Sequence, residues 1–411
     1  MGSTQPPNRA LQPEPASEAF DWNTLADEEF RAQVREFIRK NFPPHLRDHP
    51  RRIPRWHDTR PWYEALHRKG WIAPNWPREH GGMGLDASKL IVYVEEMERH
   101  GVPRLYDMGL FMLGPILIRH GSDDQKARYL PKILSGEHRW AQGYSEPNAG
   151  SDLASLRTTA QRHDHHYVVN GHKTWTTFLD DATHLFLLAR TSRAARKQQG
   201  LTLLLLDLHS PGVTRRLIRT LAGHEELGEV FLENVHVPIA DVVGTPNHGW
   251  GIAKDLLEFE RINNGSPKLG LYALEQLERF AKRQGLFDDP AFVDRFTVLR
   301  LDLQDQYSAY RHFVSLLRQG CSPGAEVSML KIWSTTTYQR LSELFLEVTG
   351  EAGVERDEPQ RAQALTALRL FYRSRPATIY SGSNEIQRNL LARRVLGLPM
   401  QTAVSLPGAS R

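Results

Sequence analysis

The sequence predicts an α+β protein in which a β-domain separates two helical domains. Apolar residues recur at helical spacing over residues 20–138, and short strand-like runs broken by Gly, Asp and Pro occupy residues 139–245. Helical spacing returns over residues 246–400, where four or five long segments are typical of a four-helix bundle. We therefore expect an N-terminal all-α domain, a middle β-barrel or β-sandwich, and a C-terminal four-helix bundle with these boundaries.

The composition is that of an ordinary globular protein. The 411 residues, 40% hydrophobic and 24% charged, are enough for two or three packed units. A formal charge of +4 gives no support for nucleic-acid binding, and apolar runs such as 201–206 are too short to span a membrane. The single Cys321 excludes an intrachain disulfide and fits a reducing compartment, so we expect a cytoplasmic protein. Residues 1–19, with four prolines, and 401–411 are expected to be flexible tails, and no signal peptide is recognisable.

The N-terminal domain is expected to be built from amphipathic helices. Helical spacing is found at 22–42, 62–69, 88–100, 105–120 and 123–134. The basic segment 47–60 is interpreted as a solvated loop, with the rim of an anionic ligand site as the alternative. The glycine cluster Gly81-Gly82-Met83-Gly84 is not a G-x-G-x-x-G pattern, and the chain has none, so a nicotinamide-binding Rossmann unit is not expected.

The middle domain has strand-like segments at 167–169, 184–189, 201–206 and 230–232. Asn170-Gly171 is a strong signal for a hairpin turn. The cluster His163-Asp164-His165-His166 invites a metal site, but its spacing matches no defined zinc pattern. We interpret it as a solvated turn and expect no metal centre.

The C-terminal domain has helical spacing at 252–264, 268–284, 290–318, 325–350 and 384–396. Its apolar faces are broad. They favour oligomerisation as well as a core, and the sequence does not separate the two.

Two stretches of the middle domain suit a flat, partly polar ring. Residues 140–153, WAQGYSEPNAGSDL, indicate a short polar strand that runs into a turn with Pro147 and Gly150. Residues 173–178, KTWTTF, set the indole of Trp175 beside hydroxyl groups. Main-chain donors, hydroxyls and an indole fit a ring such as an isoalloxazine, and a plain strand-turn-strand is the alternative.

Together with Tyr380-Ser-Gly-Ser-Asn-Glu-Ile-Gln-Arg, these stretches resemble the acyl-CoA dehydrogenase family. The resemblance runs from about residue 20 to about residue 400, with motifs in all three domains in the same order. It implies an FAD-dependent enzyme that oxidises an acyl-CoA thioester at its α,β-bond and passes the electrons to an electron-transferring flavoprotein. It also implies a homo-oligomer, dimer or tetramer. The densely apolar region 105–120 lines the acyl-chain tunnel in the family, with core packing as the interpretation we favour for any single residue there.

The reaction needs a carboxylate base at Cα, hydrogen-bond donors at the thioester carbonyl and flavin N5 at Cβ. In many family members the base is the Glu after the Tyr of the C-terminal motif, but this chain has Ser381 there, whose hydroxyl cannot take the proton unaided. Isovaleryl- and long-chain-type members instead use a Glu directly before an Arg on the first helix after the β-domain. Glu260-Arg261 matches that pattern, so we expect Glu260 to be the base, with a solvated surface residue as the alternative.

The resemblance also implies the remaining ligand contacts. The flavin contacts are Gln142, Tyr144, Ser145, Ser151, Trp175 and Thr177 around the ring, and Ser383 and Glu385 at the phosphate and adenine portion. The substrate contacts are Ser151, Arg261, Tyr380, Gly382, Arg393 and, weakly, Glu258, although Arg393 is equally well explained as a basic helix end. The family's partner-subunit segment Arg-x-x-Phe-Gly is not intact here, and Arg295 is its expected substitute. The Gly-rich turn 349–353 corresponds to another partner-subunit FAD loop.

Two other functions remain open. The same scaffold supports flavin-dependent oxygen chemistry, as an oxidase or monooxygenase. A non-catalytic or partner subunit of a mixed oligomer is also compatible, because Ser381 replaces the usual base. The sequence does not specify the acyl group, and a carrier-protein thioester is a further option.

Overall fold

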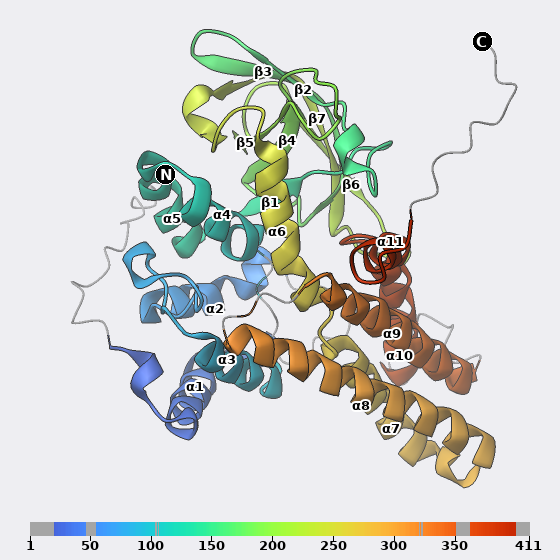
Figure 1. Cartoon of the computed structure of the whole chain (residues 1–411). Coiled ribbons are helices and arrows are strands. Elements are labelled where there is room, and N and C mark those ends of the chain that lie inside the picture. Colours follow the sequence, from blue (N-terminus) through green and yellow to red (C-terminus); the bar gives the residue numbers. More distant parts are fainter. Residues whose placement is uncertain are drawn as a thin grey trace, which may run out of the picture.

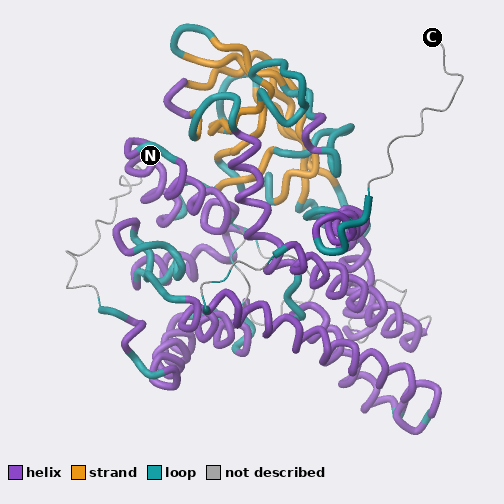
Figure 2. The backbone as a smooth tube through the Cα atoms, viewed as in Figure 1, coloured by secondary structure: helices purple, strands orange, loops and turns teal. Residues whose placement is uncertain are grey.

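The protein has a β-domain between two helical regions (Figure 1), so the predicted α+β class and the order of its parts are confirmed. Figure 2 shows the strands gathered at one end of the molecule and the helices below them. The computed structural model describes residues 20–46, 55–102, 105, 107–319, 321, 324–350 and 362–399. The tails predicted at 1–19 and 401–411 lie outside the described residues.

The N-terminal domain contains α1 (Asp27–Asn41), α2 (Trp56–Lys69), α3 (Ala87–Arg99), α4 (Gly114–His120) and α5 (Asp123–Ser135). Because α2 begins at Trp56, the solvated loop predicted at 47–60 is wrong over its last residues. Carboxylates stabilise this start: Arg55 N donates to Asp58 Oδ2 at 2.9 Å and Trp56 N donates to Asp181 Oδ2 at 3.0 Å. Residues 47–54 lie outside the described residues.

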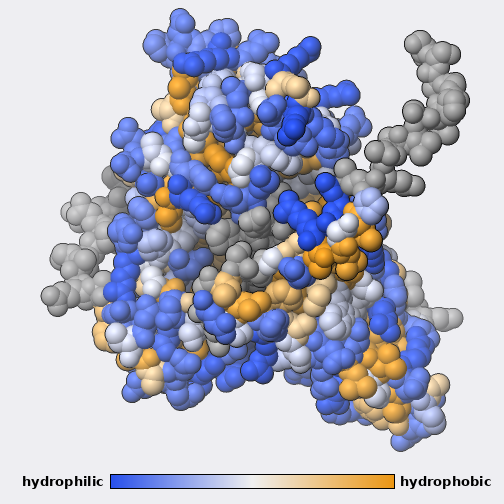
Figure 3. Space-filling model, in the orientation of Figure 1, coloured by the Kyte–Doolittle hydropathy of each residue, from blue (hydrophilic) through white to orange (hydrophobic). Residues whose placement is uncertain are grey.

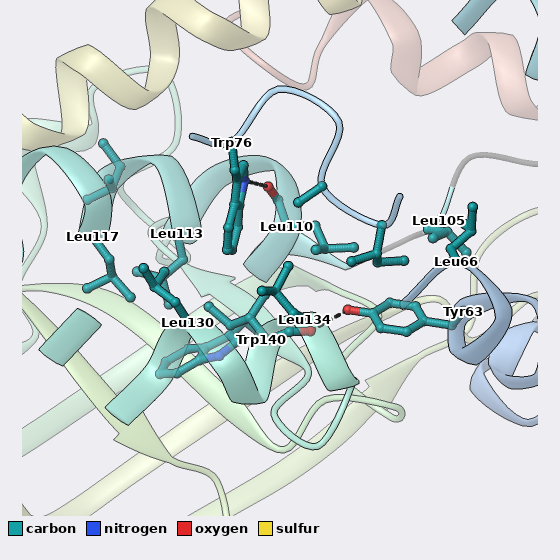
Figure 4. Close-up of a cluster of buried hydrophobic side chains, with 14 of the residues drawn as sticks. Tyr63, Leu66, Trp76, Leu105, Leu110, Leu113, Leu117, Leu130, Leu134 and Trp140 are labelled. Carbon is teal, nitrogen blue, oxygen red and sulfur yellow. Dashed lines mark hydrogen bonds between the residues drawn. The ribbon is translucent and has the colours of Figure 1, made fainter. Parts of the chain in front are cut away.

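The single helix predicted at 105–120 is divided, because Gly109–Leu113 form a π-helical turn before α4. The indole Nε1 of Trp76 donates to the Leu110 carbonyl oxygen, a main-chain acceptor within that turn, at 3.0 Å. Gly114 permits the approach, since a Cβ there would lie 1.8 Å from the Trp76 ring. Figure 4 shows Trp76 and Tyr63 among the leucines of this core.

The middle domain is one mixed sheet. Its strands are β1 (Trp140–Gly143), β2 (Thr159–Arg162), β3 (His166–Thr177), β4 (His184–Arg190), β5 (Leu201–Asp207), β6 (Val213–Ile218), β7 (Leu227–Pro238) and β8 (Val242–Val243). The order is β6-β7-β3-β2-β4-β5-β8, with β1 parallel to β4. Across the described strands the sheet is not closed, so the expected barrel or sandwich is an open mixed sheet.

The hairpin predicted at Asn170-Gly171 is wrong. Strand β3 runs through both residues, and the turn between β2 and β3 lies where His163 N donates to His166 O at 2.8 Å. The predicted solvated histidine turn is therefore this hairpin. Gly171 serves packing instead, because a Cβ there would lie 2.3 Å from Thr158 Oγ1.

The C-terminal domain contains α6 (Gly249–Asn264), α7 (Lys268–Gln284), α8 (Pro290–Arg318), α9 (Ser328–Thr349), α10 (Ala362–Ser374) and α11 (Asn384–Arg394). Helices α7 to α10 share one apolar core, and α11 packs on α9. Helix α6 contacts β5, α4 and α9 and so connects all three domains (Figure 1). No helix in the described part of the chain has the length and apolar character needed to cross a membrane.

Candidate functional site

The two sequence stretches expected to hold a flavin ring lie side by side. Thr174 N, on β3, donates to Ser145 O, just beyond β1, at 2.9 Å. This bond brings the segment with Gln142 and Ser145 next to the segment with Trp175. Because β1 is paired with β4 and not with β3, the sheet order alone would not have joined them.

A β-bulge turns the indole of Trp175 outward. Strand β3 has one residue more than β7 between Lys173 and Thr176, and both of these side chains are buried. Trp175 lies between them with φ 60° and a side chain that is 59% exposed. Thr177, the last residue of β3, is half-buried. A bulky residue held at positive φ is strained, and such residues cluster at active sites and ligand contacts.

Polar atoms near this surface are available to a ligand. Gln142 Nε2 is buried and has no hydrogen-bond partner among the described residues. Ser145 is half-buried and Tyr144 is buried. Ser151 is exposed in the turn that follows Ala149. The donors and acceptors that an isoalloxazine edge requires are therefore present beside an aromatic plane.

A buried ion pair, which sequence reasoning missed, lies between the two stretches. Lys173 Nζ is 2.8 Å from Glu146 Oε1, and the two residues are 0% and 7% exposed. Burial lowers the pKa of Lys173 to about 8, against the opposing effect of Glu146. Burial also opposes ionisation of Glu146, but the Lys173 ammonium and the hydrogen bonds from Thr158 and Arg157 together outweigh it, so the pKa of that carboxyl lies below its usual range. The only signal in the sequence was the presence of one acid and one lysine within the two stretches.

The C-terminal motif forms a strained turn before α11. Ser381 and Gly382 have φ values of 54° and 78°, and a Cβ on Gly382 would lie 2.5 Å from Gln387 Nε2. Ser383 is the N-cap of α11, and its side chain accepts a hydrogen bond from Ile386 N at 3.4 Å. The side chains of Tyr380 and Glu385, both expected to contact a ligand, are exposed. A helix start with an exposed approach suits a phosphate group.

A second buried lysine lies beneath this turn. Lys331, on α9, is 1% exposed and donates to Asn384 Oδ1 at 3.0 Å. Burial lowers its pKa to about 8, and the exposed Glu385 carboxylate opposes that change. Asn384 also donates to Thr335 Oγ1 at 3.1 Å, so the start of α11 is held on α9 by buried polar bonds.

Helix α6 carries the expected base. His120 Nε2 lies 2.9 Å from Asp255 Oδ2 and connects α4 with α6 one turn before Glu260. The side chains of residues 257–264 lie outside the described part, and with them the predicted roles of Glu258, Glu260 and Arg261. These assignments stay predictions.

The two remaining arginines are on the surface. Arg295, on α8, forms two bonds of 2.6 Å with the Glu347 carboxylate on α9, and about half of its side chain is exposed. Arg393 is exposed in the last turn of α11. Their expected contacts with FAD and CoA also stay predictions.

Two recesses lie near the site, and both are too small for FAD or an acyl-CoA. One, of about 30 Å³, is lined by Tyr63, Asp107, Arg139 and Phe178 among others. Asp107 accepts from Gly109 N at 2.7 Å and from Tyr63 Oη–H at 3.0 Å, and burial raises its pKa to about 6. The other, of about 210 Å³, lies beside the Glu146 turn. Both are smaller than the cavities that usually hold even one drug-sized ligand.

In the described ranges, no group of three His, Cys, Asp or Glu side chains has the geometry of a metal site. The donors around Gln142, the exposed Trp175 and the start of α11 fit a flavin dinucleotide.

Comparison with protein families identifies the fold. Residues 24–137, 141–235 and 247–396 match the family models for the N-terminal, middle and C-terminal domains of acyl-CoA dehydrogenase. The chain belongs to the acyl-CoA dehydrogenase family. The resemblance noted in the sequence is thus confirmed, and the chain is a member of a family of flavin-dependent oxidoreductases.

Known acyl-CoA dehydrogenases match most of the chain. Acyl-CoA dehydrogenase IpdE1 of Mycolicibacterium smegmatis is 37% identical over 401 residues, which is 91% of this chain and 98% of that protein. Mitochondrial isovaleryl-CoA dehydrogenase of Pongo abelii is 28% identical and covers 74% of each chain.

Solved structures give the same result. The Tcur3481-Tcur3483 steroid acyl-CoA dehydrogenase has a TM-score of 0.82 at 28% identity, over 91% of this chain and 98% of that chain. The ChsE4-ChsE5 complex from Mycobacterium tuberculosis has a TM-score of 0.80 at 28% identity with the same coverage.

Proposed function

We propose that this acyl-CoA dehydrogenase catalyses FAD-dependent α,β-dehydrogenation of an acyl-CoA thioester, with Glu260 as the base. The observation that carries the proposal is the bond between Thr174 N and Ser145 O, which joins the two flavin stretches beside the exposed Trp175 indole. The family membership of all three domains supports the same reaction.

Residues of different domains are proposed to carry out different parts of the reaction. FAD, when bound, supplies the acceptor for the β-hydride. Gln142, Ser145 and Thr177 are proposed to bind its ring through hydrogen bonds, and Trp175 to cover one edge. Glu260 is proposed to take the α-proton, since a carboxylate is a stronger base where water is excluded from it. Ser383, at the start of α11, is proposed to bind the pyrophosphate.

The electrons are proposed to leave through an electron-transferring flavoprotein, and the chain is proposed to work in the cytoplasm, as its single cysteine suggests. The likeness to a steroid acyl-CoA dehydrogenase supports a polycyclic acyl group as the substrate class. Arg261 and Arg393 are proposed to bind the phosphates of CoA.

An oligomer is proposed on the basis of exposed apolar residues in the C-terminal domain. Figure 3 shows apolar surface near α11 and at the far end of α7 and α8. Leu396 is 67% exposed and Leu301, on α8, is 54% exposed. Side chains of this kind on a bundle are typical of an interface between subunits.

A second candidate function is one chain of a mixed oligomer. It is favoured by Ser381, by the altered Arg-x-x-Phe-Gly segment and by the similarity to the ChsE4-ChsE5 complex. In that case a different chain would supply the missing flavin contacts.

Glu260→Gln tests the proposed base. We expect the variant to bind FAD but to lose turnover by about 10²–10⁴-fold, the range expected for a general base. Ser381→Ala is expected to keep most of the activity, and Glu275→Gln, which changes an exposed carboxylate on α7, is the control. Flavin bleaching by a panel of acyl-CoA thioesters without oxygen measures each variant. Near-normal bleaching by Glu260→Gln would contradict the assignment.

The mixed-oligomer candidate predicts a different result. The chain purified alone would be colourless in the presence of FAD, and yellow colour would develop only when a second family member is added. A yellow single-chain protein that is bleached by an acyl-CoA contradicts it.

A further inference from the structure

We propose that the ion pair between Glu146 and Lys173 is a positioning device for the flavin ring. It holds the end of β1 and the bulge of β3 at a fixed separation, so that Ser145 and Trp175 meet the same ring. The inference rests on the proposed function, because it assumes that these two segments bind a flavin. Both residues act through their neighbours and do not contact the ring.

One carboxylate connects three segments of the chain. Glu146 Oε1 accepts from Lys173 Nζ at 2.8 Å and from Thr158 N at 2.9 Å. Glu146 Oε2 accepts from Arg157 N at 2.6 Å. Lys173 Nζ also donates to Tyr144 O at 3.2 Å. The pair therefore joins the end of β1, the approach to β2 and the middle of β3.

The two residues occupy the positions that control the ring contacts. Lys173 is the last paired residue of β3 before the bulge that turns Trp175 outward. Glu146 follows Ser145 directly and opens a turn closed by two main-chain bonds with Ala149, of 3.1 and 3.0 Å. A shift of either charged side chain would move one wall of the ring site relative to the other.

Stability alone is a poor explanation for this pair. Two charges that are almost fully buried lose their hydration, and a well-packed apolar pair is often at least as stabilising. An apolar pair makes no directional contacts. The Glu146 carboxylate accepts three hydrogen bonds, and their directions fix its position relative to the donors. The charges also cancel, so the pair fixes geometry without a large net charge near the ring.

Lys173→Met is the variant that tests the inference. It leaves Glu146 with its two main-chain donors, so the full chain is expected to fold with a melting temperature within a few degrees of the parent. We expect FAD to bind about tenfold more weakly or worse, by analogy with the loss seen when a residue that orients a metal ligand is removed. The visible spectrum and midpoint potential of the bound flavin are also expected to shift, because the ring contacts are displaced.

Two further variants make the result specific. Lys132→Met breaks an ion pair with Glu137, of 3.1 Å, in which both side chains are about half exposed, and is expected to leave FAD affinity and spectrum unchanged. Lys173→Gln keeps a neutral donor towards Glu146 and is expected to recover part of the FAD affinity. If Lys173→Met does not fold, the same measurements on Lys173→Gln carry the test.

The outcomes separate this inference from the proposed function. A parent chain that fails to bind FAD contradicts the proposed function. A parent that binds FAD, with Lys173→Met or Lys173→Gln at parental affinity, spectrum and potential, overturns the positioning role. The positioning role is also overturned if bound FAD falls only in proportion to the fraction of folded protein.

Discussion

Two buried lysines lie in different domains of the candidate site and are stabilised in different ways. Lys173, in the β-domain, faces the Glu146 carboxylate at 2.8 Å. Lys331, in the helical bundle, donates to the amide oxygen of Asn384 at 3.0 Å, and no carboxylate oxygen of a described residue lies within 4.0 Å of its Nζ. Burial lowers the pKa of both to about 8.

The difference concerns where each charge is balanced. The charge of Lys173 is cancelled inside the chain, whereas Lys331 adds a positive charge beside the start of α11, which is itself the positive end of a helix. The exposed Glu385 carboxylate offsets part of this positive charge, and an anion bound at the start of α11 would offset more of it. In the β-domain part of the site the buried charges fix the positions of side chains. In the C-terminal part the positive charge suits a phosphate group.

The largest effect is expected from Glu146→Gln. It leaves Lys173 buried without a carboxylate, so the free energy of unfolding should fall by about 3–5 kcal/mol, the usual cost of breaking a buried pair. Lys173→Met should cost less than half as much, because Glu146 keeps two main-chain donors. Urea unfolding of both variants measures the difference. Equal losses in the two variants would mean that the main-chain donors do not compensate Glu146 for the loss of Lys173.

An effect of similar total size, but spread over two pH units and two lysines, is expected from alkaline pH. Each lysine has a pKa of about 8 in the folded chain and 10.5 as its ordinary value. The unfolded chain therefore binds more protons between these values, and the free energy of unfolding should rise with pH from 8 to 10. The slope is at most about 1.4 kcal/mol per pH unit for each lysine. Lys173→Met and Lys331→Met should each remove part of it, and an unchanged slope would show that neither pKa is lowered.

The smallest change in stability is expected from Asn384→Asp, which gives Lys331 the carboxylate that Lys173 already has. Stability should rise by about 1 kcal/mol, as for a charge-assisted hydrogen bond. FAD affinity should nevertheless fall several-fold, because the new charge opposes a phosphate at the start of α11. Asn41→Asp, at the exposed end of α1, adds the same charge far from the site and is the control. Unchanged FAD affinity in Asn384→Asp would separate Lys331 from the phosphate site.

Much of the fold follows from periodicities that are visible in the sequence. Helices α6 to α9 and α11 of the C-terminal domain and the strands at 184–189 and 201–206 were predicted within a few residues, whereas α10 was not predicted at all. The failures have tertiary causes. Gly171 looked like a turn residue because its contact with Thr158 cannot be seen in the sequence. The π-helical turn at Gly109–Leu113 coincides with the bond that Trp76 makes to Leu110.

The sequence by itself determined the class of the fold, the order of the domains and the positions of the flavin and C-terminal motifs, because helical and strand periodicity and short motifs are local properties. Only the tertiary structure decided which charges meet. Glu146 and Lys173 are 27 residues apart, and Lys331 and Asn384 are 53 apart. Whether such side chains bind each other or water depends on burial and on the approach of distant strands and helices, and neither is encoded in local spacing.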